Sequence, residues 1–302
     1  MNELCLIRWL RTRLPRHPRD LRGIGDDAAV LRGFQGRAIL TADMLLEGTH
    51  FRPTDPPAAV GWKALACSVS DVAAMAAVPL AATVSLGLRR GVTDRWIRGF
   101  VSGMLRCARA YDCPVVGGDT TSGTGPVAID VAVLGRADRP VLRSGARAFD
   151  AILVTGTLGG SILGKHLRFR PRLSEAQTLA RRFPLHAMMD ISDGLSLDLS
   201  RLCDESGAGA ILEEAAIPVS TAARTLAAKD GLSPLSHALS DGEDFELLFT
   251  MPEPAARRLL AKNPLGIRVS RVGTIVRERG LRLRRRDGRT VRLKPSGYVH
   301  RT

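Results

Sequence analysis

Six short clusters of acidic residues are the part of this sequence best suited to chemistry, because glycine, serine or threonine flanks each of them. The clusters hold Asp26 and Asp27, Asp43, Asp71, Asp119, Asp190 with Asp193, and Asp241 with Glu243 and Asp244. Most follow apolar runs that predict strands, as Asp119 follows residues 114–116 and Asp190 follows residues 187–189. A carboxylate that follows a strand is expected at the rim of a sheet, where ligand sites of α/β proteins are common.

Each cluster alone is explained more simply as a turn or a helix cap, since Asp, Ser and Gly favour both. Six such clusters in one chain favour a shared site instead. Converging carboxylates raise one another's pKa unless cations neutralise them. Mg²⁺ takes one or two carboxylates per ion and completes its octahedron with water and phosphate oxygens. The sequence therefore predicts a nucleotide site that holds several Mg²⁺ ions.

Other motifs offer less chemistry. The glycine-rich stretch 155–161 follows a strand-like run and precedes a helix-like one, so it predicts either a phosphate-binding turn or, more simply, a tight structural turn. It matches neither the GxxxxGK[ST] nor the GxGxxG pattern. No GxSxG motif is present, and none of the six histidines stands next to a serine or cysteine that looks activated. Catalysis through a covalent nucleophile is therefore not expected.

The elements that must position the acids fall into two halves. In the first half, the pattern predicts an amphipathic helix over 2–14, strands at 28–32, 37–43, 80–88, 114–118 and 126–135, and helices over 58–77 and 93–111. In the second half, it predicts strands near 151–154, 188–193, 209–213 and 246–250, helices over 174–182, 195–206, 219–228 and 253–262, and a C-terminal hairpin that turns at Asp287 and Gly288. Residues 143–147 form the expected linker. We therefore expect an N-terminal α/β domain over 1–142 and a C-terminal α+β domain over 143–302.

Composition narrows the class of protein. A chain of 302 residues with 45% hydrophobic and 25% charged residues is ordinary for a globular protein of two domains. The sequence holds no apolar run long enough to cross a membrane, and arginines interrupt its first apolar stretch, so we expect a cytoplasmic protein. The five cysteines are scattered without a CxxC pair, which favours buried thiols over a zinc site or a disulfide framework.

The formal net charge of +14 indicates attraction to anions, either nucleic acid or phosphorylated small molecules. A general arginine bias in the composition explains the same charge without any function. Nucleic acid is the weaker prediction, because aromatic residues make up only 4% of the chain and the arginine-rich C-terminal hairpin offers no aromatic stacking platform.

The clusters belong to longer segments that are together typical of one enzyme family. These segments run in order along nearly the whole chain: GIGDDAAVL (23–31), LTADMLLEGTHF (40–51), GWKALACSVSDVAAMAAVP (61–79), VVGGDTTSG (115–123), LRSGARAFD (142–150), VTGTLGGS (154–161), MDISDGLSLDLSRLC (189–203), LSDGEDFELLFT (239–250) and GYVH (297–300). The sequence resembles the thiamine-monophosphate kinase family of the aminoimidazole-ribonucleotide-synthetase-like superfamily.

The resemblance implies ATP-dependent phosphorylation of thiamine monophosphate to thiamine diphosphate in a homodimer whose N-terminal sheets pair across the interface. It implies several Mg²⁺ ions, with the metal positions Asp27, Thr41, Ala42, Asp43, Asp71, Asp119, Asp190 and Asp193. Of these, the resemblance makes Asp27, Asp43, Asp71, Asp119 and Asp190 the catalytic set. It places ATP against Gly118, Asp119, Arg143 and Ser192, and thiamine monophosphate against His50, Glu243 and Tyr298.

Five positions depart from the pattern that the family usually shows. Ala42 replaces a hydroxyl residue, Phe149 replaces a glycine and Gly160 replaces an aspartate. Asp241 replaces a glycine two residues before the expected substrate residue Glu243, and Arg301 follows His300 where the family usually has an aromatic residue. Two alternatives to the kinase stay open. One is a relative in the superfamily that uses ATP on another substrate, although the nucleophilic Cys or Lys in a glycine-rich N-terminal segment that such relatives normally show is absent before Gly23. The other is a binding protein without catalysis that uses the positive charge.

Overall fold

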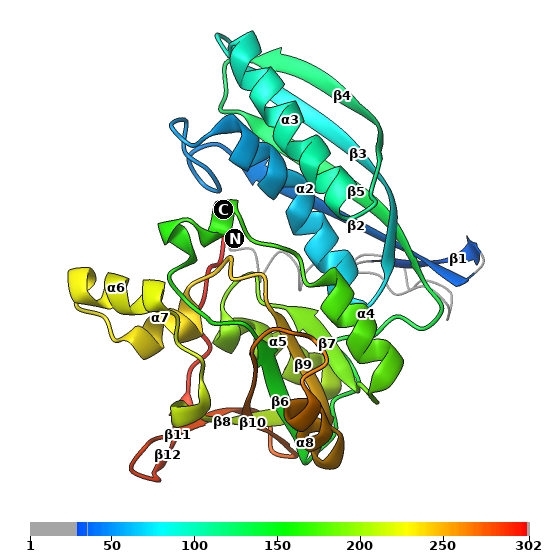
Figure 1. Cartoon of the computed structure of the whole chain (residues 1–302). Helices are drawn as coiled ribbons and strands as arrows, with labels where there is room; N and C mark the ends of the chain where they lie inside the picture. The colour runs from blue at the N-terminus through cyan, green and yellow to red at the C-terminus, as the bar shows by residue number, and fades with distance from the viewer. Residues whose placement is uncertain (1–28, 35, 301–302) are drawn as a thin grey trace.

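The computed structural model describes residues 29–34 and 36–300, which form two β-sheets with helices packed against them (Figure 1). The predicted helix over 2–14 and the candidate metal ligand Asp27 lie outside the described residues. The two-domain α/β architecture with mixed sheets agrees with the sequence-based expectation.

The first sheet has the strand order β1-β2-β5-β3-β4. Its strands are β1 (Ala29–Phe34), β2 (Gly36–Leu46), β3 (Val78–Arg89), β4 (Val115–Gly123) and β5 (Ala128–Ala137). Neighbouring strands run antiparallel except β3 and β4, which are parallel. Helices α2 (Pro57–Ala74) and α3 (Asp94–Ala110) cover one face of this sheet (Figure 1). Thr93 caps α3 by accepting a hydrogen bond from the backbone N–H of Trp96 at 3.2 Å.

Two glycines allow α2 and α3 to approach each other closely. A Cβ atom added at Gly61 of α2 would lie 1.9 Å from the carbonyl oxygen of Phe100, and one added at Gly103 of α3 would lie 1.9 Å from that of Ala58. Backbone therefore contacts backbone at the crossing. This close contact fixes where α2 lies above the sheet.

The second sheet has the strand order β12-β11-β8-β10-β6-β9-β7. Its strands are β6 (Asp150–Thr155), β7 (Ala187–Asp190), β8 (Gly209–Glu213), β9 (Leu247–Pro252), β10 (Val269–Val276), β11 (Gly280–Arg284) and β12 (Thr290–Leu293). Helices α5 (Leu195–Ser206) and α7 (Pro234–Ser240) pack on one face, α4 (Leu173–Arg182) and α8 (Glu253–Lys262) pack on the other, and α6 (Thr221–Asp230) lies beside α7. Because both faces are covered, β6 and β7 are buried along their whole length, which explains their unbroken apolar sequences.

The two halves join at the C-terminal end of α2. Ala73 packs into the core of the second half with residues of α4 and α8. Gln177 of α4 donates a hydrogen bond from Nε2 to the carbonyl oxygen of Ala77 at 3.1 Å, and the N–H of Val141 donates to the carbonyl of Met75 at 3.1 Å. Helix α2 therefore belongs structurally to both halves.

Most predicted elements are confirmed, one is wrong and two were missed. The helix-like run after residue 161 forms two single turns of 3₁₀-helix, 161–163 and 165–167, because left-handed glycines interrupt it. The sequence pattern also missed β10 and α7. Among the described residues, no helix is long and apolar enough to cross a membrane.

The glycine contact between α2 and α3 gives a stability prediction. We expect Gly103→Ala to lower the free energy of unfolding by about 3 kcal/mol, because the added methyl group overlaps the Ala58 carbonyl. Urea unfolding measures the change. Ser102→Ala, at an exposed position of the same helix, is the matched control and should shift stability by no more than about 0.5 kcal/mol. Equal stability of Gly103→Ala and the wild type would contradict the close contact.

Candidate active site

Helix α2 brings its polar residues against two carboxylates of the first half. The Ser68 hydroxyl donates to Asp43 Oδ2 at 2.8 Å, and the Thr41 hydroxyl donates to Asp71 Oδ2. Thr41 and Asp43 alternate on β2 and face α2, while Asp71 lies near the end of α2 itself. These contacts join a strand and a helix through their candidate metal ligands.

A third carboxylate reaches the same helix from the second half. The Ser70 hydroxyl donates to Asp190 Oδ2 at 2.5 Å, and Asp190 is the last residue of β7. Asp190 is 2% exposed, so its charge is held away from bulk water. Asp43, Asp71 and Asp190 are therefore gathered around one stretch of α2.

The expected position at the rim of a sheet is correct for Asp190 and wrong for two other acids. Asp43 lies in the middle of β2 and Asp119 lies in the middle of β4. For Asp43 the reason is that the rim rule applies to parallel sheets, in which strand ends point to one edge, whereas β2 is paired antiparallel on both sides. For Asp119 the reason is that β4, although parallel to β3, continues past this residue to Gly123. Ala42, on β2 between two of the candidate ligands, is exposed on the opposite face.

Asp119 does not join the other three carboxylates within the chain. β5 and β3 separate its strand from β2, so about 14 Å of sheet lies between Asp43 and Asp119. Asp43 is in register with the buried Val131, whereas Asp119 is in register with the exposed Ser85. Asp119 is itself exposed, and its neighbour Gly118 packs against the backbone of β3.

Asp193 lies in a partly buried ion-pair network at the start of α5. Its carboxylate pairs with the guanidinium of Arg201, which also donates to Asp198 Oδ1 at 2.9 Å. Asp198 accepts from the backbone N–H of Asp193 and is fully buried. Burial, helped by the charge of Asp193, raises the pKa of Asp198 to about 7. Arg143 is close enough that its positive charge acts against this rise.

The three expected substrate residues come together through two residues that the sequence analysis did not single out. The Lys63 ammonium donates to the carbonyl oxygen of His50 at 2.7 Å and to the carboxylate of Glu243. On the other side, the His50 ring lies 5.3 Å from the ring of His300, which meets Tyr298 edge to face at 4.8 Å. The C-terminal segment that carries these two rings runs up from the second half and ends between the halves (Figure 1).

His50 is held uncharged. Its Nδ1 accepts a hydrogen bond from the backbone N–H of Leu46 at 2.9 Å, which leaves the proton of the neutral ring on Nε2. Burial lowers the pKa of His50 to about 4, and the charges of Lys63 and His300 act in the same direction. A neutral imidazole N–H can donate a hydrogen bond at neutral pH without adding charge.

Glu243 lies in a loop whose backbone adopts an unfavourable conformation. Glu243 and Phe245 both have positive φ, at 62° and 49°, a conformation that residues with a side chain rarely adopt. The Phe245 ring stacks on Phe169 with centroids 3.7 Å apart. The N–H groups of Glu243 and Phe245 donate to the carbonyls of Ser192 and Ile191 at 2.6 and 2.8 Å. The 190–194 segment therefore supports the loop.

Buried charges anchor the end of this loop. Glu246 is 2% exposed and accepts from Arg172 through both Nε and a terminal nitrogen at 2.8 Å, from Lys165 at 2.9 Å and from the Thr155 hydroxyl at 2.7 Å. These contacts outweigh the effect of burial and lower the pKa of Glu246. Asp244, with no exposed surface, accepts from the N–H of Gly159 at 2.8 Å.

The glycine-rich stretch 155–161 is a structural turn, as the simpler hypothesis predicts. The N–H of Gly159 donates to Asp244, and that of Gly160 donates to Asp241 Oδ2 at 2.7 Å. The Ser161 hydroxyl donates to the carbonyl of Gly242 at 2.5 Å. Because carboxylates of the protein already occupy these amides, the turn has no free cradle for a phosphate. Asp241, one of the departures from the family pattern, thus points at the turn.

The donor atoms of this site are of the type that Mg²⁺ prefers. Within 29–34 and 36–300, no group of three or more His, Cys, Asp or Glu side chains is placed to hold a metal by itself. The carboxylate oxygens of Asp43, Asp71 and Asp190 are each the hard kind of ligand that Mg²⁺ prefers, and Mg²⁺ usually takes only one or two carboxylates beside substrate phosphate. These residues therefore fit ions that arrive together with a nucleotide.

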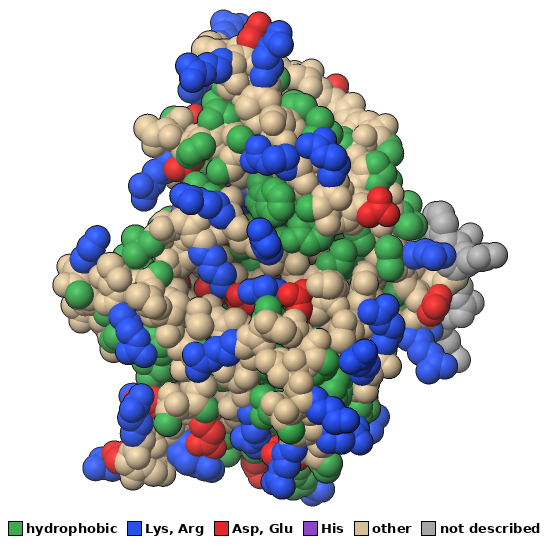
Figure 2. Space-filling model, in the orientation of Figure 1, with side chains coloured by type: hydrophobic (Ala, Val, Ile, Leu, Met, Phe, Trp, Pro, Cys, Tyr) green, Lys and Arg blue, Asp and Glu red, His purple; other side chains and the backbone are tan. Residues whose placement is uncertain are grey.

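Acidic and basic side chains gather on one face of the molecule (Figure 2). In the middle of the face shown in Figure 2, between the upper and lower halves, acidic side chains are ringed by Lys and Arg side chains. A positive surround attracts phosphorylated ligands toward the acids.

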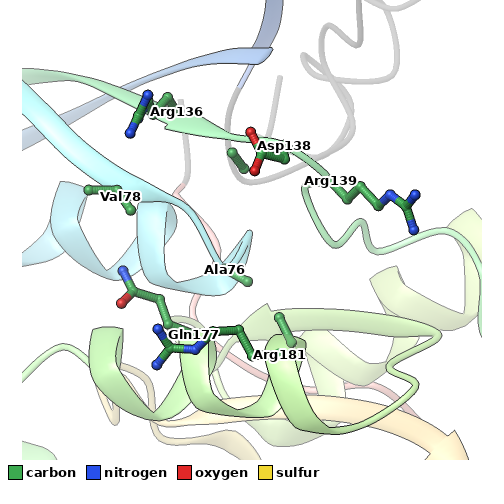
Figure 3. Close-up of a pocket in the computed structure, with 9 residues that line it drawn as sticks. Ala76, Val78, Arg136, Asp138, Arg139, Gln177 and Arg181 are labelled. Atoms are coloured by element: carbon green, nitrogen blue, oxygen red, sulfur yellow. The ribbon is translucent and has the colours of Figure 1, made fainter. Parts of the chain in front are cut away.

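A separate pocket of about 450 Å³ lies at the C-terminal end of β5, between that strand and α4 (Figure 3). It is lined by Ala76, Val78, Arg136, Ala137, Asp138, Arg139, Gln177, Ala180 and Arg181. The side chains of Arg136 and Arg139 point in different directions, so they do not converge on one anion (Figure 3).

Sequence reasoning missed the residues that hold the site residues in place. Lys63, Ser68, Ser70, Lys165 and Arg172 are the main ones. A lysine and two serines within the otherwise apolar α2 are the available signal, because a buried helix face carries polar residues only when they have partners.

Family models match both halves of the chain. The model described as AIR synthase related protein, N-terminal domain, matches residues 25–137, and that of the C-terminal domain matches residues 123–286. The fold and the site thus define an AIR synthase related protein.

More specific relatives agree with one another. The thiamine-monophosphate kinase of Rhodopirellula baltica is 40% identical over 99% of this chain and 97% of its own length. That of Aquifex aeolicus is 33% identical over 92% of each chain. A solved structure described as AaThiL complexed with AMPPCP and TMP superposes with a TM-score of 0.87 at 30% identity, covering 99% of this chain and 97% of the other. This chain belongs to the thiamine-monophosphate kinase family.

The buried Asp244 gives a prediction on pH. Burial raises the pKa of its carboxyl to about 7 in the folded protein, well above the ordinary value of 3.8. The folded state therefore binds this proton more tightly than the unfolded state, and the contribution of this carboxyl makes stability decline as the pH rises from about 4 to about 7. We expect Asp244→Asn, which cannot ionise, to flatten this decline and to be more stable than the wild type at pH 8 by on the order of 1 kcal/mol.

Urea unfolding at several pH values between 4 and 8 tests this expectation. Asp204→Asn, at an exposed position of α5, is the matched control and should keep the decline of the wild type. A decline of the same size in Asp244→Asn would show that this carboxyl does not cause it.

Proposed function

We propose that this chain transfers the terminal phosphoryl group of ATP to thiamine monophosphate and produces thiamine diphosphate. The observation that carries the proposal is that one helix, α2, contacts both groups of site residues. Asp43 and Asp190 accept hydrogen bonds from its serines, while Lys63 binds the segments of His50 and Glu243. Membership of the family and the similarity to a kinase structure with AMPPCP and TMP support the same function.

The chemistry suits such a site. The acceptor is an already ionised phosphate, so no side chain has to deprotonate it. The protein must instead neutralise charge and hold donor and acceptor in line. Asp43, Asp71 and Asp190 would hold Mg²⁺ that binds together with ATP, and the ion would supply positive charge that offsets the charge of the transferring group. The neutral His50 agrees with this scheme, because no general base is needed.

We assign the metal positions by the resemblance and by the grouping of the acids. Asp43, Asp71 and Asp190 are the proposed core of the metal site, and each already has its orientation fixed by a hydroxyl group. The remaining proposed metal positions are Asp27, Thr41, Ala42, Asp119 and Asp193. Ala42 could take part only through its backbone carbonyl, since its side chain has no ligand atom. The ion pair with Arg201 orients the Asp193 carboxylate.

Arg143, Ser192 and the Gly118-Asp119 pair are the proposed nucleotide contacts. Arg143 lies in the segment between the two sheets, and Ser192 follows β7 beside the acids. A guanidinium can bind phosphate oxygens through two parallel hydrogen bonds.

Thiamine monophosphate is proposed to bind at the other end of α2. Glu243 would accept from the amino group of the pyrimidine ring, Tyr298 would stack on a ring, and His50 would donate from Nε2. Tyr298 is 46% exposed, so its face is accessible to a ligand.

We also propose a homodimer formed through the uncovered face of the first sheet. Leu40 and Met44 of β2 point away from the helices and are 42% and 62% exposed. Met44 is in one transverse row with Asp130, Ser85 and Asp119, so a second copy on this face would also reach Asp119. Because Asp119 is distant from Asp43 in its own chain, we propose that it acts in the site of the partner subunit.

The division into domains follows the same scheme. We place the boundary between residues 142 and 143, within the connection from the end of β5 at Ala137 to the start of β6 at Asp150. We propose the cytoplasm as the location, since ATP is supplied there.

Turnover of ATP, Mg²⁺ and thiamine monophosphate to thiamine diphosphate tests the function directly. We expect Asp71→Asn to lower kcat on the order of 100-fold or more, because one charge that orients Mg²⁺ is lost. Chromatographic detection of thiamine diphosphate measures the rate. The control Asp204→Asn, an exposed acid on α5, should keep wild-type activity. A wild-type rate in Asp71→Asn would remove the basis of the metal site.

Mixed dimers test the role of Asp119. Asp71→Asn and Asp119→Asn are each expected to be inactive alone. If Asp119 acts in the partner's site, a mixed dimer holds one site with both changes and one intact site. Equal co-expression should then restore about a quarter of wild-type activity, since half of the dimers are mixed and each has one working site of two. No recovery, in preparations in which tagged pull-down shows mixed dimers, would place Asp119 in its own chain's site.

A further inference from the structure

Lys63 is a charged residue in an enclosed position. Its side chain has no exposed surface, although it stands in the middle of the apolar helix α2. Removing an ammonium from water is unfavourable by several kcal/mol unless an opposite charge and hydrogen bonds compensate for it. Its partners are the Glu243 carboxylate and the carbonyl oxygen of His50, the latter at 2.7 Å.

These partners lie in segments that are far apart in the sequence. His50 belongs to the turn that follows β2 in the first half, and Glu243 belongs to the loop before β9 in the second half. The Glu243 side chain is 28% exposed, whereas that of Lys63 is fully enclosed. Lys63 therefore cannot reach a ligand in this arrangement, but Glu243 can. An action of Lys63 on a substrate must pass through its two partners.

The position of Lys63 along the helix relates it to the carboxylates. Lys63, Cys67, Ser70 and Asp71 follow the spacing of one helix face, and the charges of Lys63 and Asp71 both act on the Cys67 thiol between them. Eight residues of α-helix separate Lys63 from Asp71, which is about 12 Å along the axis. Helix α2 thus holds the Glu243 carboxylate at a set distance from the acids proposed to bind the metal.

We propose that Lys63 is a positioning residue for substrate recognition, which is anchored by the His50 carbonyl and fixes the Glu243 carboxylate at the end of the site that takes the thiamine moiety. This inference rests on the proposed function. The ion pair of Lys63 and Glu243, which joins the two halves of the chain, would serve the binding of thiamine monophosphate. It would not serve phosphoryl transfer or nucleotide binding.

The test replaces Lys63 by Met, which keeps the length of the side chain and removes the charge. We expect the KM for thiamine monophosphate to rise at least tenfold, while kcat at saturation and the KM for ATP stay within about twofold. A residue that only supports the fold would change kcat, both KM values and the thermal midpoint together. Lys262→Met, at an exposed position of α8, is the matched control.

A second variant keeps the test decisive if Lys63→Met folds poorly because Glu243 loses its partner. Lys63→Met with Glu243→Gln removes both charges and leaves no unpaired ion. If Lys63 acts through Glu243, the double variant should show no greater rise in KM for thiamine monophosphate than Glu243→Gln alone. Multiplied effects of the two changes would mean that Lys63 acts independently of Glu243 and would overturn the inference.

The same assays separate this inference from the proposed function. A wild-type enzyme that forms no thiamine diphosphate would refute the function itself. An active wild type whose folded Lys63→Met variant keeps its KM for thiamine monophosphate would refute only the role of Lys63.

Discussion

The burial of α2 is the constraint on which the rest of the site depends. The helix packs on the first sheet and against α3, and its end enters the core of the second half, so most of its residues have no contact with water. A polar group in such a place must find a partner, because an unpaired buried donor or charge is strongly destabilising. Three polar side chains of α2 therefore bind carboxylates of other segments: Ser68 binds Asp43, Ser70 binds Asp190, and Lys63 binds Glu243. The need to satisfy buried groups thus aligns segments that the chain order keeps apart.

A rigid helix suits a reaction that depends on alignment more than on acid or base catalysis. The two kinds of partner lie at different heights on α2, with Glu243 and the His50 carbonyl at Lys63 and the other carboxylates about two turns further on. Phosphoryl transfer between two phosphates is accelerated mainly by holding them in line and offsetting their charge. The close approach at Gly61 and Gly103 fixes α2 in place. The helix can therefore hold donor and acceptor in line although most of its residues do not contact the substrate.

The sequence was sufficient to predict most helices and strands but insufficient to predict how they pack against one another. Buried strands such as β6, capped helices such as α3 and the hairpin of β11 and β12 carry local patterns, and all were predicted at nearly their observed bounds. Helix α7 is short, and in β10 polar residues and a glycine interrupt the apolar ones, so both patterns are weak and both elements were missed. The acids were recognised as a set, but their rim position was inferred from a rule for parallel sheets. Lys63 could not be connected with Glu243, because a partner 180 residues away leaves no local trace.

The loop that carries Glu243 shows how this site tolerates a change at a neighbouring position. Glu243 and Phe245 adopt left-handed backbone conformations, which are unfavourable by roughly 1–2 kcal/mol for each residue with a side chain. The stacking of Phe245 on Phe169 and the bidentate contact of Arg172 with Glu246 offset this strain. Asp241 brings an additional charge into the loop, yet its carboxylate accepts from the N–H of Gly160 and lies 3.1 Å from His237 Nδ1. The Asp241 carboxylate therefore has its partners within the protein. The Asp241 and Glu243 side chains are similarly exposed, at 26% and 28%, but Asp241 contacts the Gly160 amide and His237, whereas Glu243 contacts the buried Lys63 ammonium. The added aspartate thus supports the loop and leaves the proposed recognition of the substrate to Glu243.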